Sequence, residues 1–246
     1  MKKILLTVCA SIFFASCQKS DDAIGMVDVE SQDSVWMKLS IPTDGRGVSA
    51  IHGSIDDTLI VATMFNIYIT TDIGKSWKKA IDAGLGIAGF SLYDGELMAL
   101  GSFRGSGDKE FGERPFLFSY NNGDTWSRKG RFTYEHYDTV RVERDRVVHS
   151  DGITYRIDNN LKPIAGSTSL LHGPNKLFRV SNDTEEELYF PSKRYFNYLH
   201  LDDKNRLYVG ADGQRFEGEE EKFVYSASDS SLVYVSRQPV SDVRTK

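Results

Sequence analysis

The sequence predicts an all-β fold, a small β-propeller of four-stranded blades, and two observations carry this prediction. An eight-residue pattern, [ST]-x-[DN]-x-G-x-[ST]-W, occurs at 70–77 and again at 119–126, and its two Trp residues are 49 residues apart. A repeat of that period is typical of propellers and related arrays. From Trp36 onward, short apolar segments alternate with Gly, Asn, Asp and Pro turns, and no long helical pattern occurs, which favours strands throughout.

Each copy of the pattern is predicted to form a hairpin turn between two strands. Alternating apolar segments at 59–62, 67–69 and 116–118 precede the two copies. Asp or Asn can bond backbone N–H groups two residues on, Gly can take a positive φ, and Trp can bury a large aromatic surface. We therefore expect structural roles for Thr70, Asp72, Gly74, Ser76, Trp77, Ser119, Asn121, Gly123, Thr125 and Trp126.

The two copies, TTDIGKSW and SYNNGDTW, resemble the Asp-box, or BNR repeat, of sialidase-like β-propellers. The resemblance implies that the box turns lie on one face and that ligands bind on the opposite face, around the central channel. Sialidases of this kind carry a Tyr/Phe-Arg-Ile-Pro motif, three Arg for the substrate carboxylate, a Tyr–Glu nucleophile pair and an Asp acid/base. No Arg-Ile-Pro occurs in this chain, so these catalytic residues do not come with the resemblance.

The strand pattern predicts five blades. They cover 47–81, 87–130, 139–163, 169–190 and 196–236, and the third and fourth are degenerate because they lack a full box. Trp36 and the two residues after it echo the segments that begin at Trp77 and Trp126. We therefore predict that the Trp36 segment is an outermost strand that completes the last blade and closes the ring.

The N-terminus has the pattern of a lipoprotein signal peptide at 1–16. Lys2 and Lys3 form its charged region, an apolar run follows at 4–14, and the four residues that end at Cys17 (FASC) resemble a bacterial lipobox, whose Cys is lipidated. An ordinary secretory signal is the alternative. Residues 17–34 are polar and acidic, as in a flexible tether, and we assign 35–246 to the propeller.

The cysteine content, the residues after Cys17 and the net charge indicate the cellular compartment and the class of partner. Cys9 lies in the signal, so Cys17 alone stays in the mature chain, and neither a disulfide nor a Cys-based metal site can form. The segment 18–22 (QKSDD) resembles the export signal of surface lipoproteins in one group of Gram-negative bacteria. We expect an outer-membrane lipoprotein, bound to the membrane by the lipid at Cys17, with exposure at the cell surface as the more specific hypothesis.

The net charge argues against a nucleic-acid partner. The mature chain has 28 Lys and Arg against 35 Asp and Glu, a net charge of −7.

Three unusual segments are expected on the face opposite the boxes: a long insertion at 101–114, an aromatic-rich stretch at 131–138, and 211–221 with four Glu. Long loops on a rigid scaffold often carry function, and exposed aromatic and Arg side chains are typical of recognition sites. Solvated loops without a ligand are the alternative. A Glu run could bind Ca²⁺ but is more often simply solvated, so we expect no metal and no cofactor. The candidate binding residues are Arg104, Arg114, Tyr134, His136, Tyr137, Arg215 and Phe216.

The function predicted from these features is non-enzymatic recognition of a protein or glycan by a monomer on the cell envelope. A sialidase-like glycoside hydrolase is one alternative, although the missing motifs argue against catalysis. A glycoside hydrolase needs two carboxyl groups at a defined separation, and a sequence does not give that distance. An assembly factor, or an immunity-type protein that caps a toxin, is the other alternative.

Overall fold

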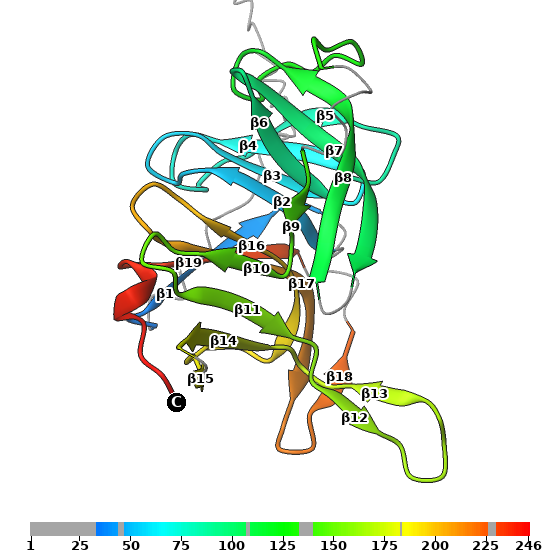
Figure 1. Cartoon of the computed structure of the whole chain (residues 1–246), viewed down its shortest axis with the longest axis vertical. Coiled ribbons are helices and arrows are strands. Elements are labelled where there is room, and N and C mark those ends of the chain that lie inside the picture. The colour runs from blue at the N-terminus through cyan, green and yellow to red at the C-terminus, as the bar shows by residue number, and fades with distance from the viewer. Residues whose placement is uncertain (1–32, 44–46, 107–108, 133–139, 183, 226–229) are drawn as a thin grey trace, which may run out of the picture.

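The computed structural model describes residues 33–43, 47–106, 109–132, 140–182, 184–225 and 230–246. Within these ranges the chain forms four main antiparallel sheets, arranged as the blades of a propeller, and one separate two-stranded hairpin (Figure 1). The all-β propeller predicted from the sequence is confirmed.

Blades 1 and 2 follow chain order. Blade 1 consists of β2 (Val48–Gly53), β3 (Leu59–Thr63), β4 (Asn66–Thr70) and β5 (Lys78–Asp82). Blade 2 consists of β6 (Gly89–Tyr93), β7 (Glu96–Ser106), β8 (Lys109–Ser119) and β9 (Val142–Glu143). Every residue of β3 is buried, which explains its continuous apolar sequence in the interior of a sheet covered on both sides.

Blades 3 and 4 each have an added feature. Blade 3 consists of β10 (Arg146–Val148), β11 (Thr154–Asp158), β14 (Lys176–Ser181) and β15 (Thr184–Glu187). Between β11 and β14 the chain leaves the sheet as the hairpin of β12 (Leu161–Pro163) and β13 (Leu170–His172), which we call the arm. Blade 4 consists of β16 (Arg194–Leu201), β17 (Leu207–Glu217), β19 (Ser231–Ser236) and β1 (Trp36–Ile41), with β18 (Lys222–Val224) paired to the end of β17. A short 3-10 helix, Val240–Asp242, follows.

The N-terminal strand completes the last blade. β1 pairs antiparallel with β19 from Trp36 opposite Ser236 to Ile41 opposite Ser231. Trp36 is fully buried, and its indole N–H donates to the carbonyl oxygen of Tyr189 at 3.0 Å. The prediction that the Trp36 segment is the outermost strand of the final blade is confirmed, and it ties the two ends of the domain together.

The prediction of five blades is wrong, because the third and fourth predicted blades form one sheet. β11 pairs directly with β14, with Asp158 opposite Lys176, so no blade boundary lies between them. The segment between these strands, 159–175, contains the arm instead. The first strand assigned to the predicted third blade contains β9, which belongs to blade 2 through the pairing of Glu143 with Phe111 on β8.

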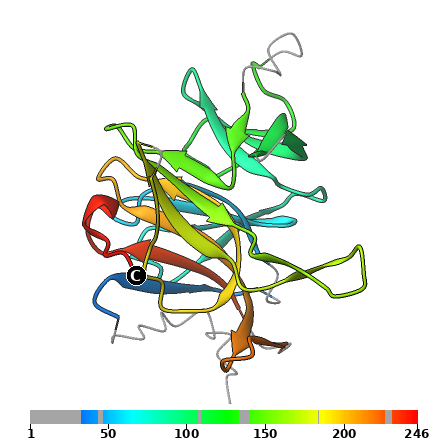
Figure 2. The ribbon, with the colours of Figure 1, turned by 60° about the horizontal axis from the view of Figure 1, so that its bottom comes forward.

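Antiparallel alternation of the strands gives the ring two faces. Face B carries the β2–β3, β6–β7 and β16–β17 turns and both box-like turns. Face A carries the connections between blades and those between second and third strands. On face A, the β7–β8 hairpin, the β17–β18 hairpin and the arm extend beyond the blades, and the arm projects clear of the sheets in both ribbon views (Figures 1 and 2).

The first box-like turn joins β4 to β5 on face B. The Thr70 hydroxyl accepts a hydrogen bond from the Gly74 N–H at 2.9 Å, and the Asp72 carboxylate accepts from the Ser76 N–H at 2.9 Å and the Ser76 hydroxyl at 2.6 Å. Gly74 has φ 74°, a conformation that side chains disfavour, and lies against Leu39 of blade 4. The turn therefore fixes the hairpin and also packs on the neighbouring blade.

The second box-like turn, after β8, repeats these bonds with an amide in place of the carboxylate. The Ser119 hydroxyl accepts from the Gly123 N–H at 2.9 Å, and the Asn121 Oδ1 accepts from the Thr125 N–H at 3.0 Å. Gly123 has φ 82° and lies against Ile60 of blade 1. Both turns thus use one geometry to dock each blade on the one before it in the ring.

Candidate functional site

A pocket of about 500 Å³ opens at the centre of face A. Blades 1, 2 and 4 and the segment that joins β9 to β10 all contribute to its walls. Val48, Met64, Ile87 and Phe103 form apolar parts of the wall. Four polar side chains line it as well: Ser49, whose hydroxyl donates to the carbonyl oxygen of Ala62, and Arg144, Asn197 and Asp212. An apolar pocket with a few convergent polar groups is the usual form of a ligand site.

Asn197 on β16 and Asp212 on β17 form a hydrogen-bonded pair in this pocket. The Asn197 amide donates to Asp212 Oδ1 at 2.6 Å. Burial raises the pKa of the Asp212 carboxyl above its usual value, although the bond from Asn197 and the charge of Arg194 act in the opposite direction. A Cβ on Gly47 would lie 2.0 Å from Asp212 Oδ1 and 2.1 Å from the Asn197 amide nitrogen, so the pair needs glycine there.

Arg194 holds the backbone that carries Asp212. This arginine is 8% exposed, and its Nε donates to the Tyr234 hydroxyl at 3.1 Å. Its Nη1 donates to the carbonyl oxygens of residues 212–214, at 3.4 Å for the first and 3.3 Å for the last. Three carbonyls that share one guanidinium fix the course of β17 where it leaves the blade, and they fix the direction of the Asp212 side chain with it.

Arg144 lies between blades 2 and 4. Its backbone N–H donates to the carbonyl oxygen of Glu110 at 2.9 Å, and its carbonyl oxygen accepts from the Leu199 N–H at 2.8 Å. The guanidinium carbon lies 4.8 Å from the centroid of the Phe103 ring, and Nη1 lies 3.8 Å from the Glu110 carboxylate. Burial lowers the pKa of Arg144, and its Nε is buried without a hydrogen-bond partner among the described residues.

Arg104 and Arg114, both predicted to bind a ligand, lie together on the β7–β8 hairpin but outside the pocket wall. Their Nε atoms lie 3.4 Å and 3.9 Å from the same carboxylate oxygen of Glu113, which is buried. The segment 101–114 is an extension of two paired strands rather than a loop insertion. The residues of this segment that line the pocket are Gly101 and Phe103, and Phe103 lies on the other side of the hairpin from Arg104.

Two further candidates lie on β17, which extends to Glu217 and so replaces most of the loop predicted at 211–221 by strand. Phe216 is buried rather than exposed, and its ring centroid lies 5.0 Å from that of Tyr195. The Arg215 Nε contacts the Glu217 carboxylate at 2.6 Å. Tyr134, His136, Tyr137 and the lipidation candidate Cys17 lie outside the described residues.

Sequence reasoning missed the polar residues of the pocket. Asn197 carried a usable signal, since it interrupts the apolar residues Phe196 and Tyr198 on an inner strand. Asp212 lies within 211–221, where residue type favoured Arg215 and Phe216 as the binding residues. Arg144 stands in a charged run between β9 and β10 and is not distinguished from its neighbours by residue type.

Face B holds a second cavity, of about 380 Å³, beside the seam between blades 1 and 4. His52 on β2 and His200 on β16 line it with their ring centroids 6.2 Å apart, and His200 Nε2 lies 2.9 Å from the carbonyl oxygen of Gly53. Burial lowers the pKa of both imidazoles, to about 4 for His52. Across the part of the chain that the structure describes, no group of three or more His, Cys, Asp or Glu is placed to hold a metal ion.

Comparison with known proteins gives no family. No family model matches the sequence, and no curated protein matches it. Among solved structures, a protein of unknown function from Bacteroides thetaiotaomicron is similar at TM-score 0.29 and 6% identity, over 81% of this chain and 72% of the other. The N-terminal domain of Nup159 is similar at TM-score 0.23 and 10% identity, over 75% and 64%. At these scores neither likeness bears on function.

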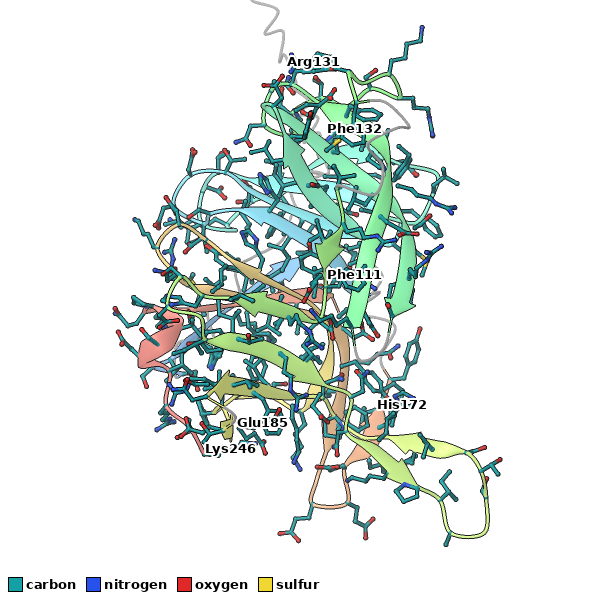
Figure 3. All side chains as sticks on the ribbon, in the orientation of Figure 1. Phe111, Arg131, Phe132, His172, Glu185 and Lys246 are labelled. Carbon is teal, nitrogen blue, oxygen red and sulfur yellow. The ribbon has the colours of Figure 1, made fainter. Side chains whose placement is uncertain are left out.

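The side chains of the arm extend into solvent on both sides of its two strands, and His172 marks the place where the arm rejoins blade 3 (Figure 3). Leu161, Leu170 and Leu171 are all about half exposed there. Among the described residues, no helix has the length and apolar character needed to cross a bilayer.

Proposed function

We propose that this chain is a non-enzymatic recognition protein that binds a protein or glycan on face A, with the central pocket receiving one group of the ligand. The observation that carries the proposal is the convergence of Arg144, Asn197 and Asp212 in an apolar pocket to which three blades contribute. Groups held by several rigid strands keep their mutual geometry, which is what a specific site needs.

Exposed apolar side chains support a macromolecular ligand. Ten of the fifteen exposed large hydrophobic residues among those described lie on face A, and they are concentrated on its projecting segments. The arm and the neighbouring Phe223 and Tyr225 supply six of them. Such surfaces on a soluble domain are typical of interaction sites.

The chemistry of the pocket supports binding rather than glycoside hydrolysis. Hydrolysis uses a pair of carboxyl groups on either side of the scissile bond. Of the described residues that line the pocket, Asp212 is the one carboxylic acid. The sialidase-like alternative predicts turnover of a fluorogenic glycoside panel. If turnover occurred and Asp212→Asn abolished it, the protein would be an enzyme and the proposed non-enzymatic function would be wrong.

A capture experiment tests the proposal. The mature chain is used to pull down ligands from envelope extract and from medium, beside Phe103→Ala/Tyr225→Ala on face A and Leu92→Ala/Ile73→Ala on face B. All four side chains are about half exposed or more, so neither double variant should unfold the protein. We expect capture to be lost in the face A variant alone, and loss in the face B variant alone would overturn the proposal.

We also propose that the chain is an outer-membrane lipoprotein anchored through Cys17 and exposed at the cell surface. The lipobox-like residues before Cys17 and the acidic segment after it support this assignment. Metabolic labelling with palmitate should be lost in Cys17→Ala. Protease treatment of intact cells should remove the domain, and complete protection would leave it on the periplasmic side.

A further inference from the structure

We infer that the central pocket of face A binds a neutral, polyhydroxylated group, a hexose unit of a glycan, in preference to an acidic or a cationic group. The inference rests on the proposed function and names the class of ligand at the same site. It depends on which charges and which unused hydrogen-bonding atoms share the pocket.

Opposite charges in one pocket disfavour a charged guest. Arg144 brings a partly buried guanidinium and Asp212 a partly buried carboxyl, and a carboxylate oxygen of Glu110 lies 3.8 Å from Arg144 Nη1. An anionic guest that approaches Arg144 therefore also meets two carboxyl groups, and a cationic guest that approaches Asp212 meets Arg144. Either guest loses its hydration on entering the pocket. Its attraction to one charge is offset by repulsion from the other, so the electrostatic interaction does not compensate for the free energy of desolvation. A hydroxyl group carries no charge and avoids that conflict.

Unused hydrogen-bonding atoms in the pocket match hydroxyl groups. Asp212 Oδ1 accepts from Asn197, whereas Asp212 Oδ2 and the Asn197 side-chain oxygen have no donor among the described residues. Arg144, whose Nε is itself buried, lines the pocket with a side chain that is 13% exposed, and its guanidinium supplies N–H donors there. The pocket thus offers two acceptors and a donor, and a hydroxyl can donate to the former while it accepts from the latter. Several adjacent hydroxyls on one ring satisfy all three.

The remaining wall suits the carbon skeleton of a sugar. Phe103 is 54% exposed, and Met64 is 49% exposed, so both present apolar surface at the pocket. An aromatic ring can cover the C–H groups of a pyranose while its hydroxyls point toward the polar side chains. The two kinds of wall, one apolar and one polar, correspond to the two kinds of surface on a hexose.

Calorimetric titration at pH 7 of the mature chain tests the inference. The ligands are glucose, galactose, mannose, N-acetylglucosamine and their short oligosaccharides, with glucuronate, N-acetylneuraminate and glucosamine as charged counterparts. We expect at least one neutral sugar to bind, at least tenfold more tightly than any charged one. Asp212→Asn and Arg144→Met should weaken that sugar roughly ten- to a hundredfold, because each removes a hydrogen bond that involves a charged group. Phe103→Ala, an exposed position, should weaken it as well without affecting the fold.

The matched control is Arg237→Met, which removes an exposed guanidinium just after β19, outside the pocket wall. It should leave sugar binding unchanged. Tighter binding of an acidic sugar or of glucosamine would overturn the inference, and so would neutral-sugar binding that survives both pocket variants. If no sugar binds while face A variants still abolish capture from envelope extract, the inference fails and the proposed function stands. If neither sugar binding nor capture from extract depends on face A, both the inference and the proposed function fail.

Discussion

The two faces of the propeller are built in different ways. Face B closes with short turns in which side chains bond the backbone, as in the Asp72 and Asn121 turns. Face A carries three projecting hairpins, and the arm has no buried position in either of its strands. Side-chain bonds thus hold the turns of face B close to the blades, whereas exposed side chains on projecting hairpins are found on face A.

The seam between blades 1 and 4 shows how face B holds the ring. Arg206 donates to the Asp202 carboxylate at 2.8 Å and to the Asp56 carboxylate at 2.7 Å. The Tyr208 hydroxyl donates to Asp202 at 2.9 Å and accepts from the Ile55 N–H at 3.0 Å. These contacts join β16 and β17 of blade 4 to the turn after β2 of blade 1. We therefore expect substitutions on face B to change stability and those on face A to change binding.

Arg194 is the clearest exception to that division, and its substitution should cause the largest loss of stability. It lies on the face A side of blade 4 yet is buried, and Arg194→Met leaves the Tyr234 hydroxyl and three carbonyls without their donor. We expect a loss of about 3 kcal/mol in the free energy of unfolding, since each unsatisfied buried group is costly. Urea denaturation measures this loss.

Arg215→Met serves as the control for that substitution, because Arg215 is 42% exposed and pairs with Glu217 at the surface. Its cost should stay below about 0.5 kcal/mol. Equal losses in the two variants would show that the carbonyl contacts of Arg194 do not stabilise the blade.

Acid should weaken face B before it affects face A. Burial lowers the pKa of His52 to about 4, and that of His200 falls as well, so the unfolded chain binds protons more readily than the folded one. Their contribution is complete above about pH 6.5 and is lost as the pH falls toward 4. For His52 alone we expect about 2 kcal/mol less stability at pH 5 than at pH 7.

The comparison that isolates this effect is wild type against His52→Gln, unfolded by urea at both pH values. Asp202 and Tyr208 lie near His200, and the variant keeps both. The wild type should lose more stability than the variant on acidification. Identical losses would mean that other groups determine the acid sensitivity.

Local sequence predicted the parts of the fold that local turn chemistry determines. The pattern around Asp72 and Asn121 was sufficient because each turn is completed within seven residues. The Trp36 strand was also predictable, since it repeats the residues that follow each box. The number of blades was not predictable. It depends on whether β11 pairs with β14 across the arm, and the residues of these strands do not indicate that pairing.

The pocket was less predictable than the fold for the same reason. Asn197, Asp212 and Arg144 come together only when β16, β17 and the segment before β10 are placed around one axis. Residue type misled at Phe216, which is typical of recognition sites but packs here between strands. The sequence thus predicted a ligand face, but it did not predict which polar side chains meet in the pocket on that face.

The box-like turns allow a finer test of how face B is stabilised. Asp72→Ala removes the acceptor for the Ser76 N–H and hydroxyl, and we expect a cost of about 1 kcal/mol. Asp72→Asn should cost less at pH 7, because Asn121 makes the equivalent bond in the second turn. Thermal unfolding of the two variants gives the order, and an Asn variant as unstable as the Ala variant would show that the negative charge itself matters.

The arm should give the smallest effect on stability, although its removal deletes the most residues. β11 and β14 pair up to Asp158 and Lys176, so the blade is complete where the arm begins. Replacing 161–172 by a short Gly-Ser turn leaves Asn160, whose amide donates to the carbonyl oxygen of Pro174 at 3.0 Å, in place. Because every residue of both arm strands is exposed, we expect a change within about 1 kcal/mol. The same deletion should reduce capture of the ligand if the exposed leucines contact it, which separates a surface kept for binding from one kept for the fold. A large loss of stability would instead make the arm a part of blade 3 and remove the contrast between the two faces.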